Sequence, residues 1–309
     1  MGLPNKLAPL LLCLLLTGCS SGQTVQPGSP TESPAVLSAP SRLSDYEHCP
    51  VYADGLLTDR ALVKDGELYL SPEALCSRLD VRFSWQGDEN SLKLSLDGTE
   101  FSGDSSREYI SGNGRYFYAP QGWFFAEDKL YLPCDLFCRF LCLDYSAAGD
   151  LSRLDISCLN ARVIPGGEDY YELNYPSEDL FWLSQIIYAE SWQQPLAGQI
   201  GVGNVVMNRV SSPDFPGTVF DVIFDMEHNI QFEPISNGSV YAQPDQLSRI
   251  AACLCLDGYN TVGDSLYFVN PAYGSGWFDS TLDLTVTIGG HNFYSVRGCL
   301  LYTSPSPRD

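Results

Sequence analysis

Glu190 lies where a carboxylate is unusual, on the apolar face of a predicted helix. Apolar residues at Leu183, Ile186 and Ile187 have the spacing of an amphipathic helix, and Glu190 continues the same face. Burial disfavours the charged form of a carboxylate and so raises its pKa. At the ordinary pKa near 4.3, roughly one glutamate in 500 is protonated at pH 7. A glutamate whose pKa is raised by burial can protonate a glycosidic oxygen.

The alternative for Glu190 is a helix end in solvent, because periodicity alone defines the end of a helix poorly. The next predicted helix favours burial. Pro195 suits its first turn. Each glycine weakens a helix by about 1 kcal/mol, so three of them indicate close packing against a neighbour, which we expect to be the Glu190 helix. These glycines are Gly198, Gly201 and Gly203.

Several short motifs follow one another between about residues 178 and 295. They are Ile187-Tyr188-Ala189-Glu190, Gly198-Gln199, Gly203-Asn204-Val205-Val206, Asn208-Arg209-Val210, Phe215-Pro216, Gln231-Phe232, Tyr267-Phe268-Val269-Asn270-Pro271, Ile288-Gly289, His291 and Phe293. Together they resemble the SleB-type cell-wall hydrolases, the spore cortex-lytic enzyme family. The resemblance implies a lysozyme-like fold, cleavage of the glycan strands of peptidoglycan, and Glu190 as the catalytic glutamate.

In the mechanism that this resemblance implies, Glu190 protonates the oxygen between N-acetylmuramic acid and N-acetylglucosamine and then acts as a base. A hydrolase would need a second carboxylate to activate water or to form a covalent intermediate. A lytic transglycosylase needs one glutamate, because the C6 hydroxyl of the substrate closes an anhydro ring; the resemblance favours this ending. Glu233, directly after Gln231-Phe232, is the strongest second carboxylate, with a solvated loop acid as its alternative. The other candidates are Asp214, Asp221, Asp225 and Glu227.

We expect four further residues to bind substrate: Gln231, Tyr267, Asn270 and His291. Tyrosine and asparagine supply the stacking and hydrogen bonds that a sugar needs, although each of the four could instead be a structural anchor. The stretch Ser191-Trp192-Gln193-Gln194 departs from the commoner family pattern, which often has a glycine and a second glutamate there. This departure concerns the local shape of the site, since Glu190 itself is intact.

Other hydrolase classes lack their residues in this chain. Zinc amidases and peptidases need clustered histidine and carboxylate ligands, and the three histidines form no HExxH motif. We therefore predict neither a metal site nor a cofactor. A serine hydrolase would need a nucleophile elbow, and Gly274-Ser275-Gly276 lacks its spacing. A Cys–His peptidase would use Cys253 or Cys255 with His291, but cysteines within an apolar helix are typical of a core.

Residues 1–18 have the pattern of a lipoprotein signal peptide, with Lys6 before the apolar run 7–16. Leu16-Thr17-Gly18-Cys19 resembles a lipoprotein box, so we expect lipidation of Cys19. The lipid would anchor the chain to the outer face of the cytoplasmic membrane, facing the cell wall, or to an outer membrane if the cell has one. An uncleaved signal anchor is the alternative. Residues 19–44 are rich in serine and proline and are predicted to be a flexible tether.

Residues 45–163 contain an internal repeat, in which the segment 68–76 matches the segment 130–138. Each copy predicts a strand, a turn, a short helix and a strand, and further strands are expected at 91–96 and 115–118. The region resembles the copper amine oxidase N-terminal-like domain. It has one histidine, His48, outside the repeat, so no copper site is expected. We interpret it as a spacer or wall-contacting module without a catalytic constellation.

Residues 168–297 form the predicted catalytic domain. Beyond its first two helices we expect helices at 218–224 and 244–256, a polar loop at 226–241 and a strand at 266–269. A hairpin is expected around Gly289-Gly290. The predicted class is α+β with two domains: a β-rich repeat domain with short helices, and a mainly helical, lysozyme-like domain with a small β-hairpin. Residues 298–309 are expected to be a non-native tail, with a natural C-terminus as the alternative.

The cysteine pattern fixes no disulfide pairing. Cys134, Cys138 and Cys142 are predicted to share one helical face, where disulfide geometry is rarely met. Cys76 and Cys138 occupy matching positions of the repeat, which indicates buried core residues.

The chain is strongly acidic, with 17 basic and 38 acidic residues and a net charge of −21. This charge argues against nucleic acid and against an anionic membrane surface as partners. Peptidoglycan stays compatible, because sugar binding needs no basic face. The alternative to an enzyme is a non-catalytic peptidoglycan-binding envelope lipoprotein. The sequence leaves the oligomeric state and the biological role (growth, division or germination) open.

Overall fold

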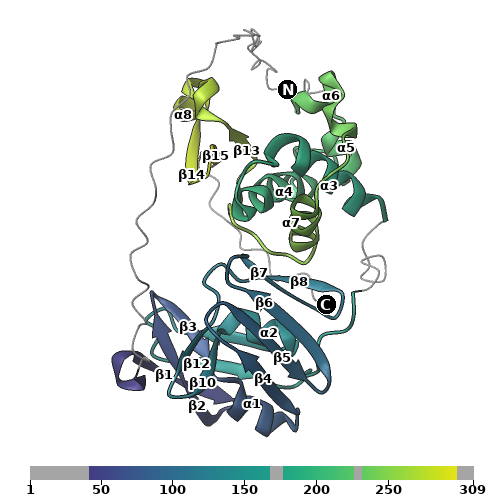
Figure 1. The fold of residues 1–309 in the computed structure, drawn as a ribbon. Helices are drawn as coiled ribbons and strands as arrows, with labels where there is room; N and C mark the ends of the chain where they lie inside the picture. The colour runs from purple at the N-terminus through teal and green to yellow at the C-terminus, as the bar shows by residue number, and fades with distance from the viewer. Residues whose placement is uncertain (1–41, 168–176, 226–231, 298–309) are drawn as a thin grey trace, which may run out of the picture. The chain divides into compact units, whose positions relative to one another are not determined.

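The structure, a computed structural model, describes residues 42–167, 177–225 and 232–297. Strands dominate up to residue 157 and helices from residue 177 onward (Figure 1), so the chain is a mixed α+β protein, as predicted. The predicted signal peptide with Cys19 and the tail 298–309 lie outside the described residues. Within those ranges, no helix combines the length and the apolar character needed to cross a membrane.

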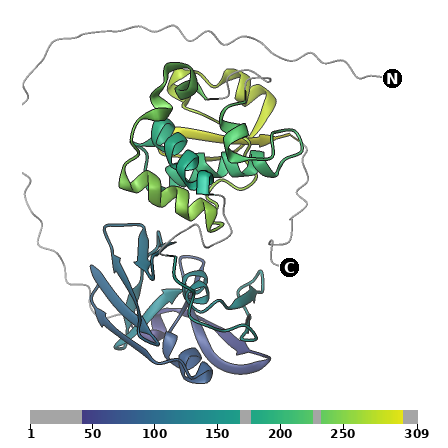
Figure 2. The ribbon, with the colours of Figure 1, turned by 90° about the vertical axis from the view of Figure 1, so that its right-hand side faces the viewer.

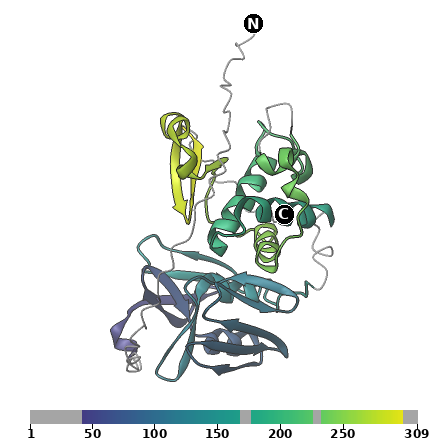
Figure 3. The same cartoon turned by 45° about the horizontal axis from the view of Figure 1, so that its top comes forward.

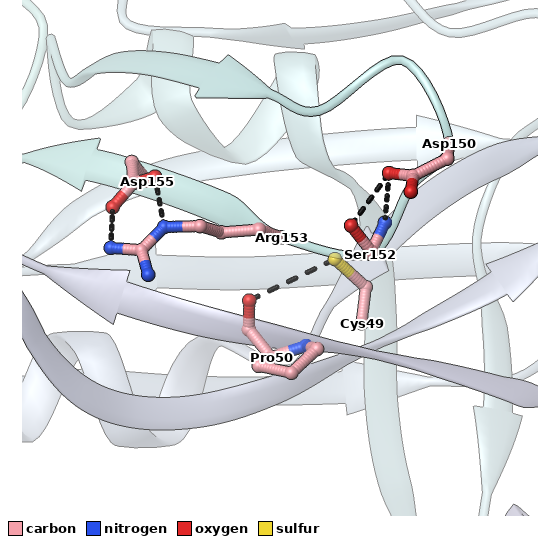
Figure 4. Close-up of polar contacts among 6 residues, drawn as sticks. All are labelled: Cys49, Pro50, Asp150, Ser152, Arg153 and Asp155. Carbon is pink, nitrogen blue, oxygen red and sulfur yellow. Dashed lines mark hydrogen bonds and ion pairs between the residues drawn. The ribbon is translucent and has the colours of Figure 1, made fainter.

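The first region contains a seven-stranded sheet. In spatial order its strands are β11 (Asp144–Ala147), β12 (Leu154–Ser157), β1 (Glu47–Ala53), β2 (Leu56–Lys64), β3 (Glu67–Leu70), β10 (Lys129–Pro133) and β9 (Phe124–Ala126). β1 and β12 are parallel, which joins the first strand of the region to the last. At the start of β12, the Arg153 guanidinium contacts both carboxylate oxygens of Asp155 at 2.6 and 2.7 Å (Figure 4). Both side chains are largely exposed, so this pair adds little stability.

A second, five-stranded sheet is an antiparallel meander. Its strands are β4 (Phe83–Gly87), β5 (Ser91–Leu96), β6 (Thr99–Asp104), β7 (Tyr109–Gly112) and β8 (Arg115–Tyr118). Residues alternate between the two faces, and Leu92, Leu94 and Leu96 are buried. On the same inner face, Phe101 and Phe117 pack against Phe140, with ring centroids 4.3 and 4.8 Å from it.

The predicted repeat is present as two copies of one element order. The first copy is β3, α1 (Pro72–Leu79) and β4, and the second is β10, α2 (Cys134–Phe140) and β11. Cys76 and Cys138 are each 1% exposed, as their matching positions predicted. The prediction that Cys134, Cys138 and Cys142 share one helical face was wrong for Cys142. Helix α2 ends at Phe140, and Cys142 follows in a turn with φ of 50°.

The second region consists of helices and a small sheet. The longer helices are α3 (Ser177–Ser191), α4 (Leu196–Ser211) and α7 (Gln246–Leu256), and the shorter ones are α5 (Val219–Ile223), α6 (Glu233–Asn237) and α8 (Gly276–Thr281). The sheet has the order β13 (Tyr267–Val269), β15 (His291–Val296) and β14 (Leu282–Ile288). It is the yellow element in Figures 2 and 3 and lies on one side of the helices. Gly289 has φ of 57°, which confirms the predicted glycine turn of the hairpin.

The prediction of a polar loop at 226–241 was wrong for its second half, which contains helical turns. Residues 226–231 lie outside the described residues, but α6 and a 3-10 turn at Ser239–Tyr241 follow them. Phe232 is 1% exposed and Pro234 is also buried. These two residues fix the start of α6 to the core, an effect that local polarity does not reveal.

The three glycines of α4 each face a different neighbour. A Cβ added at Gly203 would lie 2.6 Å from the Cys255 sulfur and 2.8 Å from Ile187 Cδ1. Gly203 therefore confirms the predicted contact with the Glu190 helix. The prediction was wrong for Gly201, which faces Phe293, and for Gly198, which lies nearest the side chain of Gln194.

A buried ion pair links β8 to the segment after α7, within the compact unit formed by Pro40–Asp309. Arg115 Nη2 lies 2.7 Å from the Asp257 carboxylate, and the two side chains are 11% and 6% exposed. Burial raises the pKa of Asp257 to about 6, against the opposing effect of Arg115 and Arg139. The effect of desolvation on the Asp257 pKa is thus larger than the opposite effect of the two arginines.

We predict that Gly203→Ala lowers the free energy of unfolding by about 1–3 kcal/mol, because the added methyl overpacks the contact with Cys255 and Ile187. Gly217→Ala is the matched control, since a Cβ there meets no atom within 4 Å, and a change within about 0.5 kcal/mol is expected. Urea unfolding of the full chain measures both. Equal stability of the two variants would show that α3, α4 and α7 do not meet this closely at Gly203.

Candidate active site

Helix α3 carries Glu190 close to its C-terminal end, beside a fully buried apolar face. Leu183, Ile186 and Ile187 are each 0% exposed, whereas the Glu190 side chain keeps part of its surface accessible. Burial raises the pKa of the Glu190 carboxyl to about 7; nearby Glu233 raises it further and Arg209 opposes both. The interpretation of Glu190 as a solvated helix end is therefore wrong. Near neutral pH about half of this carboxyl is protonated.

Arg209 on α4 supplies a buried positive charge close to this carboxyl. Its side chain is 4% exposed, and its Nε donates a hydrogen bond to the Leu266 carbonyl oxygen at 2.9 Å. Three rings surround its guanidinium, with centroids 5.1–5.5 Å from Cζ; they belong to Phe215, Phe232 and Tyr267. Burial lowers the pKa of Arg209 to about 10, so it stays cationic at neutral pH.

The Arg209 guanidinium has unused hydrogen-bonding capacity. Among the described residues, its Nη1 has no hydrogen-bond partner. The nearby acidic groups that favour its charged form are Tyr267, Asp225 and Glu190. Sequence reasoning quoted Arg209 within a motif but gave it no role. The signal that could have found it is a cation between the apolar residues Val206 and Val210 of a buried helix.

The turn after Glu190 is held by amide side chains. Gln199, 0% exposed, donates through Nε2 to the Gln194 carbonyl oxygen at 3.1 Å and accepts from Ser248 Oγ at 2.8 Å. The Gln194 side chain in turn accepts from the Gly290 N–H at 2.7 Å. The chain between α3 and α4 is thereby joined to α7 and to the hairpin turn. The stretch Ser191-Trp192-Gln193-Gln194, which departs from the family pattern, is thus fixed by this network, in which Gln194 has a structural role.

Trp192 is a second residue that sequence reasoning missed. It lies two residues after Glu190 and is 52% exposed, with its ring 6.3 Å from that of Tyr188. An exposed tryptophan ring can stack on a sugar ring.

The four predicted substrate-binding residues have different surroundings. Gln231 lies outside the described residues. Tyr267 contacts the Arg209 guanidinium, as described above. Asn270 accepts the Ala272 N–H at 3.0 Å and thereby caps a short 3-10 helix, which is the structural alternative considered for it. His291 is 6% exposed, and burial lowers its pKa. Its Nδ1 has no partner among the described residues, and its ring lies 5.3 Å from that of Phe268.

Among the predicted second carboxylates, Glu233 is the one that raises the pKa of Glu190. It begins α6 and not a loop, but it is exposed, as its interpretation as a solvated acid expected. Asp225 is 8% exposed and acts on Arg209. Asp214 and Asp221 are exposed, and Asp221 accepts a hydrogen bond from Thr218 Oγ1. Glu227 lies outside the described residues.

The surroundings of Cys255 speak against the Cys–His peptidase alternative. Cys255 is buried, its thiol donates to the Ile200 carbonyl oxygen at 3.3 Å, and burial raises its pKa well above the ordinary value. A thiol kept protonated in this way is a poor nucleophile. In the ranges 42–167, 177–225 and 232–297, no three His, Cys, Asp or Glu side chains are grouped to hold a metal ion.

Residues 193–294 match the sequence model of the family described as Cell Wall Hydrolase. The matched segment contains Arg209, Glu233, Tyr267 and His291 but begins after Glu190. This part of the chain is therefore similar to cell-wall hydrolases, whereas the role of Glu190 depends on its geometry and on the motif around it.

Named relatives agree with this class. A spore cortex-lytic enzyme from Halalkalibacterium halodurans is 34% identical over 120 residues, which is 38% of this chain and 35% of the relative. A spore cortex-lytic enzyme from Bacillus cereus is 31% identical over 119 residues, or 38% of this chain and 45% of the relative. The chain thus spans less than half the length of these two curated relatives.

A solved structure also matches by sequence. It is the catalytic domain of the germination-specific lytic transglycosylase SleB from Bacillus anthracis, with 31% identity, covering 40% of this chain and 98% of that structure. The TM-score is 0.36.

We predict that Glu190→Gln changes the pH dependence of stability. The folded chain holds a proton on Glu190 up to a pKa of about 7, whereas the unfolded chain releases it near 4.5. This residue therefore lowers stability as the pH rises through that interval. The variant should match the parent near pH 4 and exceed its free energy of unfolding by up to about 3 kcal/mol at pH 8.

Glu178→Gln, in the exposed first turn of the same helix, is the control, with an expected effect below about 1 kcal/mol. Urea unfolding between pH 4 and pH 8 measures all three proteins. If the parent and Glu190→Gln keep a constant difference across this range, the Glu190 carboxyl is not desolvated.

Proposed function

We propose that this chain cleaves the glycan strands of peptidoglycan, with Glu190 as general acid and then base. The observation that carries the proposal is a carboxyl near the C-terminal end of α3 whose pKa is raised to about 7 by burial. The match of residues 193–294 to cell-wall hydrolases supports the substrate class. The spore cortex-lytic relatives support a polymer of the cell wall or spore cortex.

In the proposed reaction, the protonated Glu190 carboxyl gives its proton to the glycosidic oxygen as the bond to C1 of N-acetylmuramic acid breaks. Positive charge then develops on the sugar while Glu190 becomes a carboxylate. The C6 hydroxyl of the same sugar attacks C1 and returns its proton to Glu190, which leaves a 1,6-anhydro ring. A pKa close to the working pH suits this exchange, because the same group must release and recover the proton.

Arg209 fits this cycle as a positioning residue. Its buried charge favours the carboxylate form of Glu190 and keeps the pKa from rising further. Without this cation, a carboxyl in such apolar surroundings would bind its proton too tightly to act as an acid at neutral pH.

A hydrolase that uses Glu233 as a second carboxylate is the other candidate, because Glu233 is close enough to raise the pKa of Glu190. Water would then replace the C6 hydroxyl as the attacking group, and the products would have reducing ends. A raised Glu190 pKa lowers the stability of the folded chain at neutral pH. A protein that only binds glycan would have no use for such a carboxyl.

We further propose that a lipid on Cys19 holds the chain at the outer face of the cytoplasmic membrane, with the copper amine oxidase N-terminal-like region between the anchor and the catalytic region. The sequence pattern Leu16-Thr17-Gly18-Cys19 supports this proposal.

Digestion of purified peptidoglycan by the full chain tests the main proposal. The parent should release anhydro-muropeptides, and Glu190→Gln should lower the rate at least about 100-fold, because it removes the proton donor. Glu178→Gln should stay within about twofold of the parent. The parent rate should fall above about pH 7, where Glu190 loses its proton. Undiminished activity of Glu190→Gln would remove this residue from the mechanism.

Glu233→Gln separates the two endings. If Glu190 acts alone, this variant stays active and its rate begins to fall at a lower pH than in the parent, because one cause of the raised Glu190 pKa is gone. Loss of activity, together with reducing-end products from the parent, would instead establish a hydrolase with two carboxylates. Mass spectrometry of the muropeptides gives the product type.

For the anchor, we predict that Cys19→Ser abolishes incorporation of a radiolabelled fatty acid and releases the chain from the membrane fraction of expressing bacteria. A labelled Cys19→Ser chain would show that the lipid is attached elsewhere.

A further inference from the structure

The outer face of the five-stranded sheet carries a hollow of about 770 Å³, lined entirely by residues 84–116. It belongs to the first region and shares no residue with the site around Glu190. The inner face of the same sheet packs against the core through Leu92, Leu94 and Leu96. Leu94 is also in the lining, but the polar lining residues Lys93 and Ser95 alternate with these leucines and so lie on the opposite, outer face.

Strand register arranges one continuous polar row across this face. Lys93 pairs with Gln86 on one side and with Ser102 on the other. Ser102 pairs in turn with Ser111, and Ser111 with Tyr116. Five strands at roughly 4.8 Å spacing make this row about 19 Å long. It is long enough to follow several units of an extended polymer.

The size of the side chains explains why the face is hollow. Ser102 and Ser111 in the middle of the row are small, and Ser95 is a further small residue of the lining. Longer side chains, such as Gln86 and Tyr116, stand at the two ends of the row. Two charged side chains besides Lys93 also line the hollow, Glu100 on β6 and Arg115 on β8.

The chemistry of the row suits a polymer that both donates and accepts hydrogen bonds. Serine hydroxyls and the Gln86 amide can do both. Lys93 is the exposed cation of the row, and among the described residues its ammonium group forms no ion pair. In a chain of net charge −21, this unpaired ammonium is available to a carboxylate from outside. Peptidoglycan combines sugar hydroxyls and acetamido groups with carboxylates along one strand.

We propose that this hollow binds a peptidoglycan strand, with the serine row hydrogen-bonded to the sugars and Lys93 paired with a carboxylate of the polymer. This inference rests on the proposed function for the identity of the polymer. It gives the first region a role as a second contact with the wall, which keeps the catalytic region on its substrate between cleavage events.

Cosedimentation of the full chain with insoluble peptidoglycan sacculi tests this inference. Lys93→Glu should weaken binding about tenfold, the effect of losing one charged hydrogen bond. Ser102→Ile should weaken it similarly, because it fills the centre of the hollow with an apolar side chain that suits a strand. Lys129→Glu is the control: it makes the same change of charge at an exposed position of the same region, outside the hollow. We expect the control to bind within about twofold of the parent.

Cleavage of short soluble glycan fragments, measured on the same proteins, separates this inference from the proposed function. Both variants should cleave short fragments like the parent while they cleave sacculi more slowly. Parent-like sedimentation of Lys93→Glu and Ser102→Ile, or no sedimentation of the parent, would overturn the inference. If no protein cleaves glycan but sedimentation still depends on Lys93, the proposed function fails and the binding site stands.

Discussion

The removal of water from one carboxyl group is the constraint on which the second region depends. Glu190 must be desolvated enough to hold a proton near neutral pH, yet it must stay accessible to a substrate. The apolar face of α3 provides the first condition through Leu183, Ile186 and Ile187, and the end of the helix provides the second. A carboxyl held in this way reduces the stability of the fold, so the packing around it has to compensate.

That compensation comes from close helix contacts and from a buried cation. Gly203 lets α4 approach both Ile187 and Cys255, so α3, α4 and α7 share one core. Arg209, on the same helix, is held by the Leu266 carbonyl oxygen and by aromatic rings. One helix thus supplies both the packing that desolvates Glu190 and the charge that limits the effect of this desolvation on its pKa.

The two regions differ in how they could meet a polymer. The helical region presents one raised-pKa carboxyl, which is a local feature suited to a single bond. The five-stranded sheet presents a long polar row with small side chains, an extended arrangement suited to a strand. A buried pair between Arg115 and Asp257 connects β8 to the end of α7, so the sheet that carries the row also contacts the helical region.

The sequence by itself determined the elements whose signal is local. Periodicity and glycine turns predicted α3, α4, α7, the hairpin and both copies of the repeat, and placed Glu190 on a buried face. Only the tertiary structure decided which residues lie next to Glu190 and next to the glycines of α4. It brought Arg209 and Glu233 to Glu190, gave Gly198 and Gly201 neighbours other than α3, and ordered α6 where polarity indicated a loop. The physical reason is that spacing along a chain fixes which face a side chain occupies, whereas packing between distant segments fixes what that face meets.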